Sequence, residues 1–327
     1  MKTYLSKLLS AQTLSSEEAK NAILQIGSGE INPSQIAAFL MGIQQKGIAV
    51  DELKGFREGM LELAIEIDLN EFDAMDVCGT GGDGKDTFNI STTSAFLVAG
   101  AGQNVAKHGN HGVSSSVGSS TVLEHLGVKF TNDSNFLRSK IEKAGICYLH
   151  APLFHPAMRF VGPIRKELGI KTFFNILGPL MNPAKVQKQL SGVFDITTFE
   201  LYKELFKTSE TRFGVVHALD GYDEVSLTGN FRLAENSSDN VINPNEIGME
   251  LVDDQELNGG NSLEESAKIM LNILKNQGTK AQTNTVLTNA GIALGIAREI
   301  TIEEGISQAK ESLESGMALR SLEILLG

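Results

Sequence analysis

Apolar residues recur every three or four positions over the first seventy residues, which is the spacing of one face of a helix. Three helices are predicted there: one after the capping-box pair Ser15 and Glu18, one beginning at Asn32-Pro33, and one over residues 51–66. No run rich in β-branched residues separates them. We therefore expect residues 1–70 to form a small helical domain, joined by helices near residues 165–185.

From residue 74 onward, short apolar runs alternate with helical patterns. Strands are predicted at residues 74–78, 104–106, 146–149 and 213–217. Helices are predicted at residues 91–101, 121–126, 262–275, 284–297 and 302–313, and a polar loop at 236–245. This alternation is typical of an α/β fold. Residues 71–327 are thus expected to form a larger α/β domain with a mostly parallel central sheet flanked by helices.

The composition excludes several classes of protein. The 327 residues carry a formal net charge of −12, which argues against the basic surface of a general nucleic-acid-binding protein. Two cysteines are too few for a disulfide scaffold, and no apolar run approaches the roughly 20 residues of a membrane helix. We expect a cytoplasmic protein that binds neither membranes nor nucleic acid. The unusual count is 33 glycines, about a tenth of the chain.

Four of these glycines fall within six residues, directly after the first predicted strand. Glycine backbone N–H groups at a strand-to-helix turn can surround a phosphate, so we interpret this segment as an anion site rather than a tight turn. It also matches parts of two known motifs, which the neighbouring residues exclude. The dinucleotide fingerprint requires an acidic residue at the end of the next strand, where Lys107 stands. The P-loop requires Ser or Thr after Lys85, where Asp86 stands.

A second candidate anion site follows the next predicted strand. Lys107 is placed at the end of that strand, and residues 114–120 form a loop rich in Ser and Gly. Because the ends of parallel strands meet at one edge of a sheet, the two loops are expected to lie side by side. Two such sites suit a ligand with phosphates at both ends.

Four segments in this order carry a family resemblance. They are Gly79-Thr-Gly-Gly-Asp83, Asn89-Ile-Ser-Thr92, Lys107-His-Gly-Asn110 and Phe174-Asn-Ile-Leu-Gly-Pro-Leu180. Together with Asp223-Glu224 downstream, they closely resemble the anthranilate phosphoribosyltransferase family over nearly the whole chain. The resemblance implies a Mg²⁺-dependent homodimer that transfers a phosphoribosyl group from 5-phosphoribosyl 1-pyrophosphate to anthranilate, the second step of tryptophan synthesis.

The resemblance also implies the residues of the site. The donor, phosphoribosyl pyrophosphate, would contact Gly79, Gly82, Asp83, Thr87, Asn89, Ile90, Ser91, Thr92, Lys107, His108, Gly109, Asn110, His111, Gly112, Val113, Ser114, Ser115 and Ser119. Anthranilate would contact Gly79, Asn110 and Arg165, with His155 and Met158 as further candidates, and Mg²⁺ would bind Ser91, Asp223 and Glu224. No catalytic residue is assigned, because the reaction requires positioning and charge neutralisation more than covalent chemistry.

Other interpretations of these residues remain open from the sequence. Taken alone, Asp223-Glu224 would fit a solvated loop and Arg165 a surface helix. Core packing is as good an explanation as ligand contact for Met158. A pyrimidine nucleoside phosphorylase, or a nucleic-acid-binding relative without catalysis, would share part of the pattern.

Three positions depart from the residues usual in the resembled family. His111 stands where Arg is common, Ser116 where Lys is frequent, and Thr121 where Asp is common. Since two cationic positions near a polyanion are absent, weaker affinity for the donor is expected unless other residues compensate.

Overall fold

The computed structural model describes residues 1–112 and 117–327, and its N-terminal part is a bundle of helices. The bundle comprises α1 (Lys2–Leu9), α2 (Ser16–Gly27), α3 (Pro33–Lys46) and α4 (Val50–Glu62). Local sequence signals set their ends. Ser15 and Glu18 form the predicted capping box of α2, Asn32 accepts from the Gln35 N–H at the start of α3, and Gly47 ends α3 with φ of +83°.

A seven-stranded sheet forms the centre of the larger part, in the order β3-β2-β1-β4-β5-β6-β7. Its strands are β1 (Met75–Gly79), β2 (Val105–Gly109), β3 (Ile146–His150), β4 (Lys188–Gly192), β5 (Arg212–Ala218), β6 (Phe231–Glu235) and β7 (Asp239–Ile242). The strands from β3 to β5 pair in parallel, and β6 and β7 are antiparallel. The predicted mostly parallel sheet is therefore confirmed. The predicted loop at 236–245 is wrong, because β7 lies within it.

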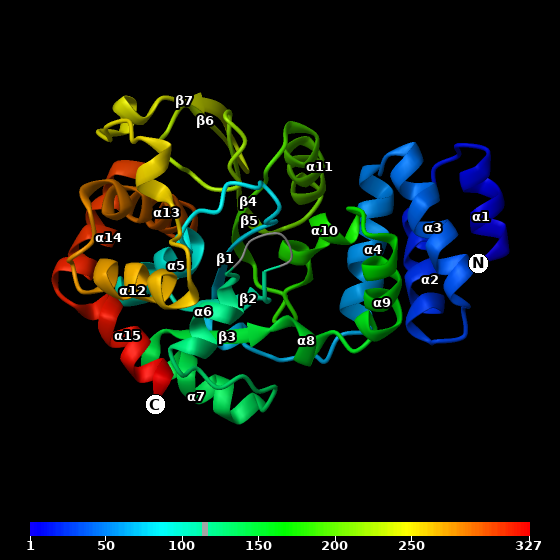
Figure 1. Ribbon diagram of the computed structural model, residues 1–327, viewed down its shortest axis with the longest axis horizontal. Coiled ribbons are helices and arrows are strands. Elements are labelled where there is room, and N and C mark those ends of the chain that lie inside the picture. Colours follow the sequence, from blue (N-terminus) through cyan, green and yellow to red (C-terminus); the bar gives the residue numbers. More distant parts are fainter. Residues whose placement is uncertain (113–116) are drawn as a thin grey trace.

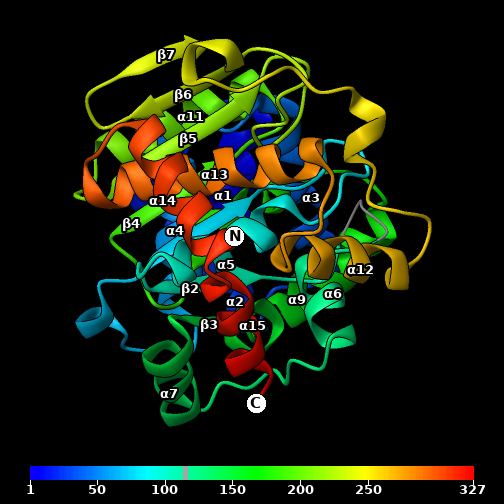
Figure 2. The same ribbon diagram turned by 90° about the vertical axis from the view of Figure 1, so that its left-hand side faces the viewer.

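Helices cover both faces of this sheet. They are α5 (Ile90–Gly100), α6 (Ser119–His125), α7 (Ser134–Ala144), α11 (Ile196–Lys207), α12 (Leu263–Leu274), α13 (Lys280–Arg298), α14 (Ile302–Glu314) and α15 (Met317–Leu326). Figure 1 shows α12–α15 at one end of the molecule and the N-terminal bundle at the other, with the sheet between them. Figure 2 looks from the end with α12–α15, where α13 and α14 lie side by side and α5 lies behind them.

The chain between β3 and β4 runs through α8 (Ala151–Phe154), α9 (Met158–Leu168), α10 (Phe174–Leu177) and the 3₁₀ turn η2 (Gly178–Met181), and its α9, α10 and η2 pack against the bundle. The turn η1 (Asn70–Phe72) precedes β1, and the turns η3 (Pro244–Ile247) and η4 (Asp254–Leu257) lie between β7 and α12. Phe173, just before α10, stacks on Phe56 of α4 with ring centroids 4.2 Å apart and meets Phe39 of α3 edge-on at 6.2 Å. The bundle therefore shares an aromatic contact with the chain that leads into β4.

Within residues 1–112 and 117–327, none of the helices has both the length and the apolar character that a membrane crossing requires.

Candidate functional site

The glycine-rich loop leaves β1 at Gly79 and leads into α5, beside the ends of β2, β4 and β5. Gly81, Gly82 and Gly84 have φ of +66°, +85° and +72°, values that side-chain-bearing residues rarely adopt. Both ends of the loop are fixed by the backbone: Thr80 N–H donates to Gly192 O at 2.9 Å, and Gly259 N–H donates to Asp86 O at 2.9 Å. The loop is thus a defined surface with exposed peptide groups.

The acidic pair after β5 contacts both ends of this loop. Asp223 Oδ2 accepts a hydrogen bond from Gly81 N–H at 2.6 Å, and Glu224 Oε1 accepts one from Ser91 N–H at 2.8 Å. The approach is close enough to require glycine, since a Cβ on Gly79 would lie 2.5 Å from Asp223 Oδ2. The three residues predicted to bind Mg²⁺ are therefore neighbours in space, although 132 residues of sequence separate Ser91 from Asp223.

Burial makes the two carboxylates of this pair unfavourable as free anions. It raises the pKa of Asp223 to about 7, with repulsion from Asp83 adding to the effect. Burial and the neighbouring Asp223 raise the pKa of Glu224 well above its ordinary value. Neither carboxylate has an ion-pair partner among the described residues. A bound divalent cation would remove this cost, and oxygen ligands are those that Mg²⁺ prefers.

The described residues do not enclose a cation on their own. Within residues 1–112 and 117–327, no group of three or more His, Cys, Asp or Glu side chains is arranged to hold a metal ion. Two carboxylates and a hydroxyl leave the remaining positions to water or to a ligand with phosphate oxygens. This donor set fits Mg²⁺, which usually keeps several waters and binds through one or two carboxylates together with substrate phosphates.

Lys107 lies inside β2 rather than at its end, because the strand continues to Gly109, beyond the predicted end at residue 106. Its ammonium is almost completely buried and donates to Val77 O of β1 at 2.6 Å. Burial lowers the pKa of Lys107, and the nearby Asp76 carboxylate opposes the shift. Lys107 therefore places a positive charge under the strand ends, although its amine contacts backbone in this structure.

The segment after β2 packs against the first loop and against β3. Asn89 Nδ2 donates to Val117 O at 3.1 Å, so the two predicted anion loops lie side by side. Ser119 Oγ lies 2.8 Å from Tyr148 Oη and donates to Asn110 O at 3.3 Å. Asn110, His111 and Gly112 are exposed. The predicted donor residues Val113, Ser114 and Ser115, and the departing residue Ser116, lie outside the described residues.

Two of the three positions that depart from the resembled family contact each other. His111 Nδ1 lies 3.2 Å from Thr121 Oγ1, and the His111 ring meets the His150 ring at 5.1 Å between centroids. His150 in turn stacks on Phe130. A polar contact between His111 and Thr121 therefore lies at the rim of the second loop.

Arg165 of α9 has one hydrogen-bonding group without a protein partner. Its Nη2 donates to Asn175 Oδ1 at 3.1 Å, and its guanidinium lies over the Phe174 ring at 5.4 Å. Its Nε is buried and contacts no acceptor among the described residues. Burial lowers the pKa of Arg165. A planar carboxylate would supply the missing acceptor, since guanidinium groups bind carboxylates through two parallel hydrogen bonds.

His108 of β2 and His155, which follows α8, form a buried pair. Their Nε2 atoms are 3.3 Å apart, and burial lowers the pKa of His108 well below its ordinary value and that of His155 to about 4. Both rings are therefore neutral near pH 7. His155 Nδ1 is buried and has no partner among the described residues. Met158, the first residue of α9, is half-buried and packs against the bundle core.

A buried polar network that the sequence did not predict connects His108 with Asp76 and Asn182. Asp76 Oδ1 accepts from His108 N–H at 3.3 Å, and Asp76 Oδ2 accepts from Asn182 Nδ2 at 2.9 Å. Burial raises the pKa of Asp76 to about 6, and Lys107 opposes the shift. A carboxylate within the apolar run 74–78 was a visible signal for such a network.

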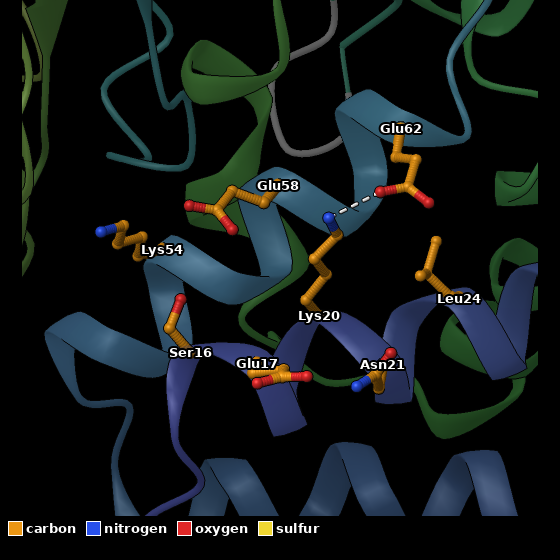
Figure 3. Close-up of a pocket in the computed structure, with 8 residues that line it drawn as sticks. All are labelled: Ser16, Glu17, Lys20, Asn21, Leu24, Lys54, Glu58 and Glu62. Carbon is orange, nitrogen blue, oxygen red and sulfur yellow. Dashed lines mark ion pairs between the residues drawn. The ribbon is translucent and has the colours of Figure 1, made fainter.

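Two cavities lie away from the glycine-rich loop and contain none of the predicted site residues. One, of about 370 Å³, lies between η3 and helices α13 and α14. The other, of about 530 Å³, is a groove between α2 and α4 that Figure 3 shows. Its residues are Ser16, Glu17, Lys20, Asn21, Leu24, Lys54, Glu58 and Glu62. Lys20 and Glu62 form an ion pair at 2.6 Å across the groove, and the groove has no glycine-rich loop of the kind found at the strand ends.

Comparison with known proteins agrees with this geometry. Residues 71–319 match the a/b domain of the glycosyl transferase family, and residues 2–64 match its helical bundle domain. The chain is thus built as a two-part glycosyl transferase.

The relatives and solved structures specify the family further. Anthranilate phosphoribosyltransferase of Flavobacterium johnsoniae is 52% identical, with 99% of this chain and 98% of that protein aligned. The Thermus thermophilus enzyme superposes with a TM-score of 0.93 at 34% identity, covering 99% of this chain and 98% of the other. The Saccharomyces cerevisiae enzyme in complex with PRPP and Mg superposes with a TM-score of 0.91 at 28% identity, covering 99% of this chain and 96% of the other. The chain belongs to the anthranilate phosphoribosyltransferase family, as its sequence motifs predicted.

Proposed function

We propose that this protein transfers the phosphoribosyl group of 5-phosphoribosyl 1-pyrophosphate to the amine of anthranilate, the second step of tryptophan synthesis. The products are N-(5-phosphoribosyl)anthranilate and pyrophosphate. One observation carries the proposal: an acidic pair, the buried Asp223 and the half-buried Glu224, accepts hydrogen bonds from both ends of a glycine-rich strand-end loop. Such a site suits a ligand that brings phosphate oxygens and a divalent cation together.

The residues present fit Mg²⁺, with Ser91, Asp223 and Glu224 as its protein ligands. When bound there, Mg²⁺ neutralises charge on the departing pyrophosphate. Gly81 and Ser91 orient the two carboxylates through their backbone N–H groups. The described part of the proposed donor site consists of two segments, from Gly79 to Thr92 and from Lys107 to Gly112, together with Ser119.

Arg165 binds the carboxylate of anthranilate and thereby orients this acceptor. Gly79 and Asn110 complete the acceptor site. The anthranilate nitrogen forms a bond to C1 of the ribose and gives up one proton, as the bond from C1 to the pyrophosphate oxygen breaks. Positive charge develops on the ribose ring, as in other glycosyl transfers. The protein holds the two substrates in line, so the reaction needs no nucleophilic side chain.

The proposal extends to assembly and location. A homodimer in the cytoplasm follows from the resemblance to the family, and light scattering of the purified full chain measures the assembly directly. A monomer at micromolar concentration would contradict the dimer without affecting the proposed reaction.

The decisive experiment follows anthranilate fluorescence with and without phosphoribosyl pyrophosphate and Mg²⁺. Consumption is expected only when both are present. Asp223→Asn with Glu224→Gln should reduce Mg²⁺-dependent turnover by at least a hundredfold. The control, Glu311→Gln with Glu314→Gln on the exposed face of α14, removes the same charge and should leave turnover unchanged.

Two results would contradict the proposal. Near-normal turnover of the Asp223/Glu224 variant would remove the metal assignment. Phosphorolysis of a pyrimidine nucleoside, without anthranilate consumption, would replace the proposed reaction with the alternative that the sequence left open.

A further inference from the structure

Lys171 connects the segment between α9 and α10 to the glycine-rich loop. Its Nζ donates to Gly82 O at 2.8 Å, across 89 residues of sequence, and lies over the Phe194 ring at 4.4 Å from the centroid. Nothing in the sequence pattern distinguished this lysine from the exposed Lys166 nearby. The contact involves the part of the loop that its backbone hydrogen bonds to Gly192 and Gly259 do not reach.

A hydrogen bond to the Gly82 carbonyl determines the orientation of the peptide between Gly82 and Asp83. Gly81 and Gly82 both have positive φ, and glycine changes φ and ψ at little steric cost, so the peptide between Gly82 and Asp83 is free to turn over unless something holds it. A trans peptide points its C=O and N–H in opposite directions. Fixing the Gly82 carbonyl toward Lys171 therefore fixes the Asp83 N–H on the other side. Oriented N–H groups of such loops bind phosphate oxygens.

The other end of the connection involves the acceptor arginine. Asn175 Oδ1 accepts hydrogen bonds from Thr172 N–H at 2.9 Å and from Arg165 Nη2 at 3.1 Å. Asn175 N–H donates in return to Thr172 O at 2.8 Å. The residue next to Lys171 is thus held by the same amide oxygen that holds Arg165.

We propose that Lys171 is a positioning residue for the donor: it holds the Gly82–Asp83 peptide in the orientation that binds pyrophosphate, from a segment anchored at Asn175 beside the acceptor arginine. This inference rests on the proposed function and adds to it a residue outside the predicted donor set. A contact from the acceptor side of the site would thereby prepare the donor loop.

Lys171→Met, Lys171→Arg and a control, Lys166→Met on the exposed face of α9, test this in the full chain. Lys171→Met should raise the donor KM about tenfold, the size expected for one hydrogen bond from a charged group. Its kcat at saturating donor and its anthranilate KM should stay within twofold of wild type. Lys171→Arg keeps a charged donor and should return the donor KM to within about threefold. Lys166→Met should change none of these constants.

The outcomes separate this inference from the proposed function. An unchanged donor KM in Lys171→Met would overturn the positioning role, and so would equal increases in both KM values together with a lower melting temperature, since that pattern reports general damage. Failure of Lys171→Arg to restore the donor KM would also overturn it. Failure of the proposed function would instead show as no anthranilate consumption by the wild-type protein.

Discussion

Three charged side chains of the candidate site, Asp223, Glu224 and Arg165, have no ion-pair partner among the described residues, and the proposed ligands would supply one to each. Asp223 is buried and Glu224 is half-buried, and the pKa of each carboxyl is raised, so their ionised forms need a cation. Arg165 has a buried Nε that needs an acceptor. An unsatisfied buried polar group costs about 1–3 kcal/mol, so both gaps are expensive in the free protein. Substrate binding would recover that cost, which fits a site prepared for ligands.

His111 offers a test of electrostatics at the second loop. Its imidazole bonds to Thr121 Oγ1, and His111→Arg would place a permanent cation beside the donor phosphates. We expect the donor KM to fall about threefold to tenfold, with kcat and the anthranilate KM nearly unchanged, because one charge-assisted hydrogen bond is added. Steady-state kinetics at fixed Mg²⁺ measures the change. His125→Arg, at an exposed position of α6, adds the same charge outside the predicted site and is the control. An unchanged donor KM in His111→Arg would refute the electrostatic argument.

The residue types of the site were largely predictable from sequence, but their contacts were not. The Gly79–Thr92 segment and Asp223-Glu224 stand out as motifs. The hydrogen bonds that join them depend on β1 and β5 being brought to one sheet edge. Lys107 shows the limit. It was expected at the end of a strand, but it lies inside β2, and its ammonium donates to Val77 O.

At the level of elements, the apolar runs predicted β1, β2, β3 and β5, whereas β4, β6 and β7 were not predicted. β4 reads Lys-Gln-Leu-Ser-Gly, with one large apolar residue. Gln189 and Ser191 are nonetheless buried in it, because Gln189 Nε2 donates to Pro179 O and to Ser191 Oγ. β7 is an edge strand with mostly exposed residues, so its polar composition resembles that of a loop. Hydrophobic periodicity detects burial against apolar surfaces and gives no signal in either case.

The buried, neutral pair of His108 in β2 and His155 after α8 should make the free energy of unfolding depend on pH. The pKa of His155 is about 4 in the folded protein and about 6.5 in an unfolded chain. The unfolded state therefore binds the proton first as the pH falls. Stability that is present above pH 6.5 is lost progressively down to pH 4, by on the order of 1–3 kcal/mol from this group.

His155→Gln should remove part of this loss. The free energy of unfolding of the variant, relative to wild type, should increase as the pH falls from 7 to 4.5, whatever the cost of the substitution at pH 7. Urea unfolding at several pH values measures the difference. His125→Gln at an exposed site of α6 should run parallel to wild type. A His155→Gln curve parallel to wild type would show that this ring is not buried in its neutral form.

At the scale of the whole molecule, the sequence pattern changes near residue 70, but the hydrophobic core continues across this boundary. Phe39 and Phe56 of the bundle belong to one buried cluster with Phe173, and the same cluster continues through Phe199 of α11 to Phe213 of β5. The two matched family segments, 2–64 and 71–319, meet across this cluster. A helical domain made of residues 1–70 alone would expose these aromatic faces to water.

We therefore expect the excised segment 1–70 to lack a cooperative thermal transition, while the full chain shows one. Within the full chain, Phe173→Ala should lower the free energy of unfolding by about 3–5 kcal/mol, since it removes a ring packed between helices α3 and α4. Ile170→Ala, three residues earlier and 44% exposed, should change the free energy of unfolding by less than about 0.5 kcal/mol. Calorimetry of the fragment and urea unfolding of the variants are the measurements. If the fragment unfolds cooperatively and Phe173→Ala changes the free energy of unfolding only slightly, the bundle is an independent domain. The donor and acceptor halves of the site would then be joined by the chain and by Lys171, without a shared core to hold them in line.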